Sequence, residues 1–161
     1  MSKVQRAFLM GVGLVAMGSV PFAQATAATT VLGATVCVRA DVNGQGGLVY
    51  NSTGVTNDSG AKLDVVCTLF RDNTTNTNGM QDLEVALFDP SATAGVMSCD
   101  GITQNRNGSV VKVVHKAATA VGNTVIDFGS SVNTSVSKGY YVVRCTLPNG
   151  ATLRSIFYQE P

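Results

Sequence analysis

Residues 139–160, GYYVVRCTLPNGATLRSIFYQE, carry the strongest fold signal in the chain. Two runs of bulky and β-branched residues flank Asn149-Gly150, and an Asn-Gly pair between such runs is typical of a two-residue hairpin turn. The pattern predicts two paired antiparallel strands in which Tyr141 lies opposite Tyr158. The face of the first strand that carries Cys145 is otherwise apolar, so we expect it to belong to the core. Its other members are Tyr141, Val143 and Leu147.

Alternating apolar and polar residues recur along the rest of the chain, and charged residues make up only 13% of it. This composition and period favour strands over helices. Further strands are predicted at 32–39, 48–52, 63–69, 82–89, 96–103, 109–117 and 124–128. The sequence therefore predicts a single-domain all-β sandwich of the immunoglobulin-like or jelly-roll type. The chain has no Trp, and Val143 stands where a true immunoglobulin domain usually has Tyr, two residues before Cys145.

Two of these strands place particular side chains on one face or the other. In 32–39, strict alternation puts Cys37 on the more polar face, which conflicts with a fully buried disulfide there. In 109–117, Lys112 and Lys116 lie on the same side. We interpret that side as the solvated face of the strand.

The four cysteines are Cys37, Cys67, Cys99 and Cys145. An even number in an exported chain predicts disulfides, and four cysteines allow three pairings. We favour Cys37–Cys67 and Cys99–Cys145, one bridge in each half of the chain. The phrases DVVCTL (64–69) and VVRCTL (142–147) echo one another, through either convergence or two related halves. The sequence has no Cys-x-x-Cys pair of the kind found in zinc sites, so we do not expect these cysteines to bind a metal.

The first 27 residues have the features of a secretory signal peptide. Lys3 and Arg6 precede an uncharged stretch at 7–20, and small residues permit cleavage after Ala25 or Ala27. The stretch is shorter than the ~20 residues that cross a bilayer, so we expect no transmembrane anchor after cleavage. The predicted organisation is a signal peptide, 1–27, and one domain, 28–161, in a protein that is secreted, periplasmic or on the cell surface.

The charge balance and the absence of known motifs argue against several classes of function. Without Lys3 and Arg6, nine of the eleven basic residues remain against ten acidic ones, so nucleic acid is not an expected partner. His115 is the one histidine, and we expect it to be a half-buried strand residue. No Gly-x-Ser-x-Gly motif or cofactor motif is present. Asp82 and Glu84 alternate on a strand, which is typical of a solvated side. We therefore predict that the protein is not an enzyme and that it binds no cofactor.

Candidate ligand-binding residues are few. No metal site with a full ligand set is evident, but the oxygens of Asp72, Asn76, Asn78 and Asp82 could gather around a calcium ion. Tyrosine rings can stack on sugar rings, and the candidates for this role are Tyr50, Tyr140 and Tyr158.

The chain resembles a group of uncharacterised small exported bacterial proteins. The resemblance is carried by a first cysteine, by the stretch 67–79 that begins Cys67-Thr-Leu-Phe-Arg-Asp-Asn, and by 140–148, Tyr-Tyr-x-x-x-Cys-x-Leu-Pro. A closing strand with Tyr and Glu follows. Thr68 departs from the Pro that other members tend to have after this cysteine. The group has no established activity, so the resemblance implies only export and a β-rich fold.

We expect a non-enzymatic structural or adhesive role at the cell envelope or extracellular matrix, through self-association or binding to surface components. One variant is a pilin-like subunit that donates the strand 29–38 to a neighbour. The alternative is a carbohydrate-binding module, although the absence of Trp counts against it.

Overall fold

The computed structural model describes residues 28–41, 46–71, 79–92, 96–133 and 138–161. Strands and two short 3-10 turns make up its regular structure. The elements are β1 (Ala28–Gly33), η1 (Ala34–Val36), β2 (Val38–Arg39), β3 (Leu48–Asn51), β4 (Gly54–Asn57), β5 (Leu63–Leu69), β6 (Asp82–Asp89), β7 (Ser98–Gln104), β8 (Val110–Ala117), β9 (Gly122–Asp127), η2 (Gly129–Val132), β10 (Tyr140–Leu147) and β11 (Thr152–Glu160).

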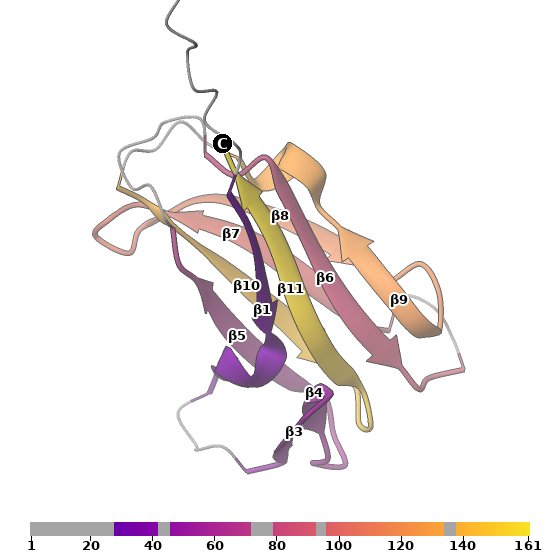
Figure 1. The fold of residues 1–161 in the computed structure, drawn as a ribbon. Helices are drawn as coiled ribbons and strands as arrows, with labels where there is room; N and C mark the ends of the chain where they lie inside the picture. Colours follow the sequence, from indigo (N-terminus) through magenta and orange to yellow (C-terminus); the bar gives the residue numbers. More distant parts are fainter. Residues whose placement is uncertain (1–27, 42–45, 72–78, 93–95, 134–137) are drawn as a thin grey trace, which may run out of the picture.

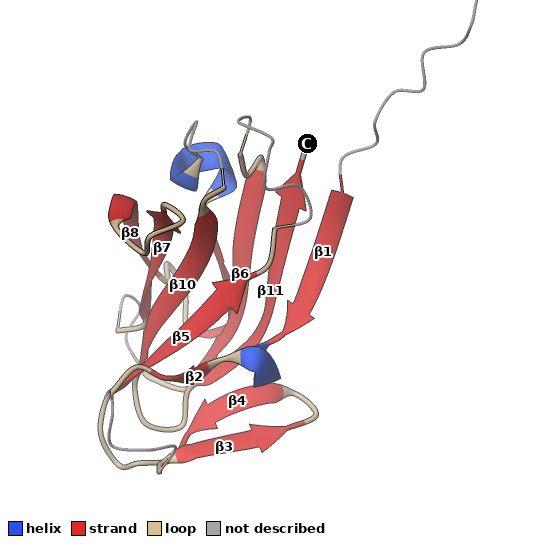
Figure 2. Cartoon of the chain, turned by 90° about the vertical axis from the view of Figure 1, so that its left-hand side faces the viewer, coloured by secondary structure: helices blue, strands red, loops and turns tan. Residues whose placement is uncertain are grey.

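Two antiparallel sheets pack face to face, which confirms the predicted all-β sandwich (Figures 1 and 2). Sheet A has the order β3-β4-β11-β6-β9, with β1 also paired to β11, and sheet B has the order β2-β5-β10-β7-β8. The β3–β4 hairpin projects from the foot of the sandwich, and β1 begins beside the end of β11. No helix in the described ranges is long and apolar enough to cross a membrane.

Period-two burial was predicted well in the central strands. On β5 the residues Leu63, Val65, Cys67 and Leu69 are buried, and the intervening residues are not. On β6 the buried set is Leu83, Val85, Leu87 and Asp89. These two faces meet across the core, because strands of a sandwich place alternate residues inside.

The predicted pairing of residues 140–147 with 151–158 is wrong, although each segment forms a strand. A turn at Asn149-Gly150 does form, and Ala151 N donates to Pro148 O over 3.1 Å. However, β10 pairs with β5 and β7 in sheet B, whereas β11 pairs with β1, β4 and β6 in sheet A. Tyr141 therefore lies opposite Leu69 and Thr103 in sheet B, and Tyr158 belongs to the other sheet.

Asn57, the last residue of β4, forms hydrogen bonds with residues on both sides of this turn. Its backbone N–H donates to Ala151 O, and its carbonyl accepts from Gly150 N. Its buried side chain donates to Leu147 O over 2.8 Å. Asn57 thus fastens both sides of the turn to the end of β4, while β10 and β11 belong to different sheets and face one another across the core.

The predicted first strand, 32–39, is two strands separated by η1. β1 belongs to sheet A and β2 to sheet B, so the chain crosses the sandwich at η1. A 3-10 turn has about three residues per turn, so it shifts the phase of the alternation. Cys37 is therefore fully buried, while Val36 and Val38 are 45% and 49% exposed. This removes the conflict between alternation and a buried bridge.

Both favoured disulfides are present, and none of the four cysteines is free. Cys99 and Cys145 lie directly opposite one another on β7 and β10, with Cα atoms 4.0 Å apart. Cys37, just before β2, is bonded to Cys67 on β5. Both bridges therefore fasten neighbouring segments of sheet B, and neither links it to the strands of sheet A.

Buried polar contacts join the two sheets near the C-terminal end of β11. Arg71 Nε lies 2.9 Å from Glu160 Oε1, and the two side chains are only 3% and 4% exposed. The Tyr158 hydroxyl donates to Phe70 O over 2.7 Å. The Arg71 guanidinium also lies 5.5 Å from the centre of the Tyr141 ring. The motif residues behind the family resemblance thus meet in an inter-sheet contact with a structural role.

Both lysines of β8 are exposed, as predicted, but the face that carries them is the inner one of sheet B. Cys99, on the inner side of β7, lies opposite Lys116, so Lys112 and Lys116 point to the inner side of the sandwich edge. They donate to the carbonyls of Asn133 and Asp127 over 3.3 and 2.5 Å. The two ammonium groups can lie there because β8 is an edge strand that stays largely exposed on both sides. Three elements were not predicted, β4 and the 3-10 turns η1 and η2.

Candidate functional site

A row of charged side chains crosses the outer face of sheet B. Register pairs Asp100 of β7 with both Arg144 of β10 and His115 of β8. Asp64 lies diagonally across from Arg144 on β5 and bonds to it. Asp64, Asp100 and Arg144 point away from the core, because their neighbours along each strand are buried, and register places His115 on the same side as Asp100. We call these four residues the charged row.

Arg144 and Asp64 form the most strongly connected pair of the row. Arg144 bonds Asp64 Oδ2 through Nη2 and, at 3.2 Å, through Nε. Thr146 donates its hydroxyl to Asp64 Oδ1 over 2.6 Å. Burial by itself raises the pKa of Asp64, but the bonds from Thr146 and Arg144 and the guanidinium charge outweigh it and lower the pKa. Hydrogen bonding to Asp64 raises the pKa of Arg144 in turn.

His115 ends the row at the sheet edge. Its Nδ1 lies 2.7 Å from Asp100 Oδ1, and its side chain is 65% exposed. The expectation of a half-buried histidine is therefore wrong, because β8 is an edge strand with solvent on its outer face. An acid–histidine pair resembles two members of a catalytic triad, but the third member must be a nucleophile within reach of the imidazole. The described residues give His115 no such hydroxyl or thiol contact.

An open pocket of about 360 Å³ adjoins the other end of the row. β2 and β10 flank β5 on opposite sides, so their side chains meet around the first residues of β5. Five charged side chains line it, Arg39, Asp41, Lys62, Asp64 and Arg144, together with Ala40 and Leu63. Its volume lies in the ~300–1,000 Å³ range of small-molecule sites, but its lining is far more polar than usual.

Four of the five charged side chains of the pocket, all except Lys62, are held by contacts with one another or with neighbouring groups among the described residues. Arg39 Nη2 lies 2.6 Å from Asp41 Oδ2, and Arg39 Nη1 donates to Gly46 O over 2.6 Å. Asp64 is held by Arg144 and Thr146. These residues were not among the candidates predicted from the sequence. The sequence feature that could have indicated them is a pair of opposite charges at outward positions of two otherwise apolar strands, Asp64 in DVVCTL and Arg144 in VVRCTL.

The three candidate tyrosines do not form one sugar-stacking surface. Tyr158 is 3% exposed and lies in the core, so the prediction that it could stack on a sugar is wrong. Tyr50 of β3 is 40% exposed and donates its hydroxyl to Cys37 O over 3.0 Å; burial raises its pKa. Tyr140 begins β10 on the outer face of sheet B, opposite Gln104, and is half-buried. Only Tyr140 shares a face with the charged row.

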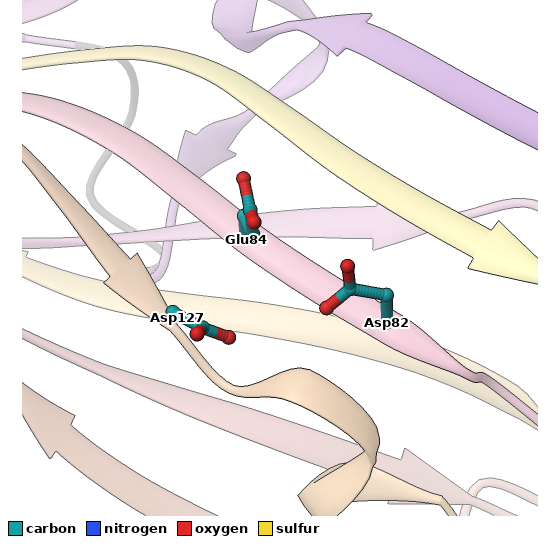
Figure 3. A group of neighbouring side chains, drawn as sticks. All are labelled: Asp82, Glu84 and Asp127. Carbon is teal, nitrogen blue, oxygen red and sulfur yellow. The ribbon is translucent and has the colours of Figure 1, made fainter.

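A group of three acids lies on the outer face of sheet A. Figure 3 shows Asp82 and Glu84 on β6 and Asp127 at the end of β9. Each offers a carboxylate oxygen, and these oxygens lie within 4.8 Å of one another. Of the calcium candidates, Asp82 is therefore joined by Glu84 and Asp127. Asp72, Asn76 and Asn78 lie outside the described residues.

Comparisons with known proteins show a distant likeness to carbohydrate-related β-sandwich structures. A xylan-binding module CBM15 matches with a TM-score of 0.45 and 12% identity, over 84% of this chain and 97% of that one. Xylanase10C (mutant E385A) from Cellvibrio japonicus, in complex with xylopentaose, matches with a TM-score of 0.36 and 12% identity, over 77% of this chain and 25% of that one. No family model and no curated protein matches the chain.

Proposed function

We propose that this protein is an exported, non-catalytic adhesive β-sandwich that binds carbohydrate through the outer face of sheet B. The observation that carries the proposal is the charged row with the pocket at its end. Saccharides are recognised by side chains that donate and accept several hydrogen bonds in fixed positions. The row and the pocket together offer guanidinium and ammonium donors, carboxylate acceptors and the Thr146 hydroxyl on one continuous surface.

Preorganisation supports this use of the face. Each acid of the row already contacts a basic partner, so little rotamer entropy remains to be lost when a ligand binds. The β5, β10 and β7 strands under the row are fastened by the two disulfides of sheet B. Bridges of this kind are also typical of proteins that reach an oxidising compartment, in agreement with the predicted export.

The non-catalytic part of the proposal follows from the chemistry of the two clusters. The His115–Asp100 pair lies on an exposed strand edge, where solvent surrounds the imidazole. The Asp82, Glu84 and Asp127 group lies on the outer face of sheet A, and these acids do not line the pocket. These three side chains range from half-buried to exposed.

Self-assembly is the second candidate function, and the exposed edge of sheet B favours it. Val110, Val111 and Val113 of β8 are 56%, 47% and 53% exposed. Two features oppose strand addition at this edge, the inward-pointing lysines and the irregular pairing between β7 and β8 near Thr103. The predicted donor segment 29–38 is divided between β1 and β2, which pair with β11 and β5 of the same chain.

Affinity electrophoresis of the oxidised mature chain, in gels cast with a panel of soluble polysaccharides, tests the carbohydrate proposal. We expect retardation by at least one polymer, and loss of the retardation in R144A. The reference variant is R154A, because Arg154 is an exposed arginine of sheet A, next to Phe88. Unretarded migration in every gel would contradict the proposal. Light scattering after size-exclusion chromatography tests assembly, since large species that the change V113K abolishes would favour the second candidate.

A further inference from the structure

The pocket at the end of the charged row has an excess of positive charge. Three basic side chains and two acidic side chains line it. Asp41 is paired with Arg39, and Asp64 with Arg144. Lys62, which directly precedes β5, is exposed and forms no salt bridge within the described ranges. The pocket therefore holds one ammonium group beyond those that its own acids neutralise.

Arg144 has donor capacity that its partner does not use. A guanidinium carries five N–H groups. Its bonds to Asp64 involve only Nε and Nη2, and its side chain is 49% exposed. Nη1 and the second N–H of Nη2 are therefore not used by Asp64, and Arg144 lines the pocket. The pair formed by one N–H on each of these two nitrogens matches the spacing of the two oxygens of a carboxylate.

The two acidic side chains of the pocket indicate which groups the ligand must carry besides a carboxylate. Asp41 and Asp64 line the same pocket, and carboxylate oxygens accept hydrogen bonds from hydroxyl groups. A bare inorganic anion would gain nothing from these oxygens and would be repelled by them. A ligand with both a carboxylate and neighbouring hydroxyls satisfies both kinds of side chain.

From these contacts we infer that the pocket binds the carboxylate of an acidic sugar, a uronic acid unit of a polysaccharide. The Arg144 guanidinium and the Lys62 ammonium hold the carboxylate, while Asp41 and Asp64 accept ring hydroxyls. The inference rests on the proposed carbohydrate binding and specifies its ligand class. A mature chain with nine basic and ten acidic residues can then bind an anionic polymer, because its excess positive charge is confined to one pocket.

Titration calorimetry of the oxidised mature protein with trigalacturonic acid tests the inference. Galactotriose, which has hydroxyls without carboxylates, and a sulfated galactan oligosaccharide are the comparison ligands. We expect trigalacturonic acid to bind more tightly than either, and its affinity to fall as salt is added. In K62Q we expect its affinity to fall about tenfold, since hydrogen bonds to charged groups have effects of this size.

R106Q is the matched control, because Arg106 is an exposed residue after β7, at the opposite end of β10 from the pocket. We expect it to bind like the unchanged protein. Equal loss in K62Q and R106Q would overturn the inference, because it would reveal a general charge effect. Equal or tighter binding of galactotriose or of the sulfated oligosaccharide would also overturn it. Binding of galactotriose would still support the proposed carbohydrate-binding function. Failure of all three ligands, and of the wider polysaccharide panel, would overturn both proposals.

Discussion

The buried ion pair between Arg71 and Glu160 yields the sharpest stability prediction. It joins the segment after β5 in sheet B to β11 in sheet A. The proposed perturbation is E160Q, which removes one charge and nearly preserves the shape of the side chain. The Arg71 guanidinium then stays buried and loses the Glu160 carboxylate, while it lies 3.5 Å from Gly139 O and 5.5 Å from the centre of the Tyr141 ring.

The expected loss is large because the pair is almost completely removed from water. Its side chains are 3% and 4% exposed, and breaking a buried pair from one side costs ~3–5 kcal/mol. The amide oxygen of glutamine can still accept one hydrogen bond from Arg71, so we expect a value near ~3 kcal/mol for E160Q. R71M should cost a similar amount. The double replacement should cost less than the sum of the two, because no charge remains unpaired.

Urea unfolding followed by far-ultraviolet circular dichroism measures these differences. With a slope of about 2 kcal/mol per molar urea, a loss of ~3 kcal/mol lowers the midpoint by about 1.5 M. The matched control is E84Q, the same chemical change at a half-buried position opposite Asp127. Because like charges lie opposite one another there, E84Q should be neutral or slightly stabilising.

Equal midpoints for E160Q and E84Q would refute the reasoning. That result would mean that the Arg71–Glu160 pair contributes no more than an exposed pair, at most ~1 kcal/mol. Additive losses in the R71M/E160Q double variant would refute the coupling between the two residues even if each single loss were large.

Three further predictions concern the disulfides, the packing of η2 and the charged row. The double change C99A/C145A should lower the free energy of unfolding by ~4 kcal/mol, because the bridge joins residues 46 positions apart. Gly101→Ala should cost ~1–3 kcal/mol in urea unfolding, since a Cβ there would lie 2.3 Å from Val132 Cγ1. The lowered pKa of Asp64 contributes stability above the unfolded pKa of ~3.9, and this is lost as pH falls through the folded pKa, so D64N should show a smaller loss between pH 5 and pH 2.

Each of these predictions has a result that contradicts it. Identical urea midpoints for the double-alanine variant and the oxidised protein would mean that the bridge does not stabilise the fold. The control for Gly101 is Gly33→Ala, because a Cβ at Gly33 would meet only Thr35 Oγ1, at 3.7 Å; equal losses at both positions would exclude a packing cause. For Asp64, a variant whose stability falls with pH as steeply as that of the unchanged protein would show that its titration is not linked to folding.

The segments that could be predicted from sequence are those in which local pattern and tertiary environment agree. β5 and β6 alternate strictly between apolar and polar residues, and both bury the apolar face, because each has a packed sheet on one side and solvent on the other. The favoured disulfide pairing, one of the three that the sequence allowed, is also present. Phe70 alternates with the buried Leu69 and is exposed, in agreement with the alternation.

The errors arise where a contact far away in sequence determines the outcome. The local signal for a hairpin at Asn149-Gly150 is strong, but β10 pairs with β5 and β7 and β11 pairs with β6, while distant Asn57 bonds to the turn. η1 shifts the phase between β1 and β2, which buries Cys37. Lys112 and Lys116 point inward because β8 happens to be the edge strand of sheet B.

The sequence by itself determined the β-sandwich class and the core faces of the central strands, because period and composition are local properties. The tertiary structure alone decided which strands are neighbours, and therefore which polar residues meet. Asp64 and Arg144 are 80 residues apart, and only the pairing of β5 with β10 brings them together beside Lys62. A binding surface on a sheet is a property of strand order, and strand order depends on long-range hydrogen bonding that no single segment encodes.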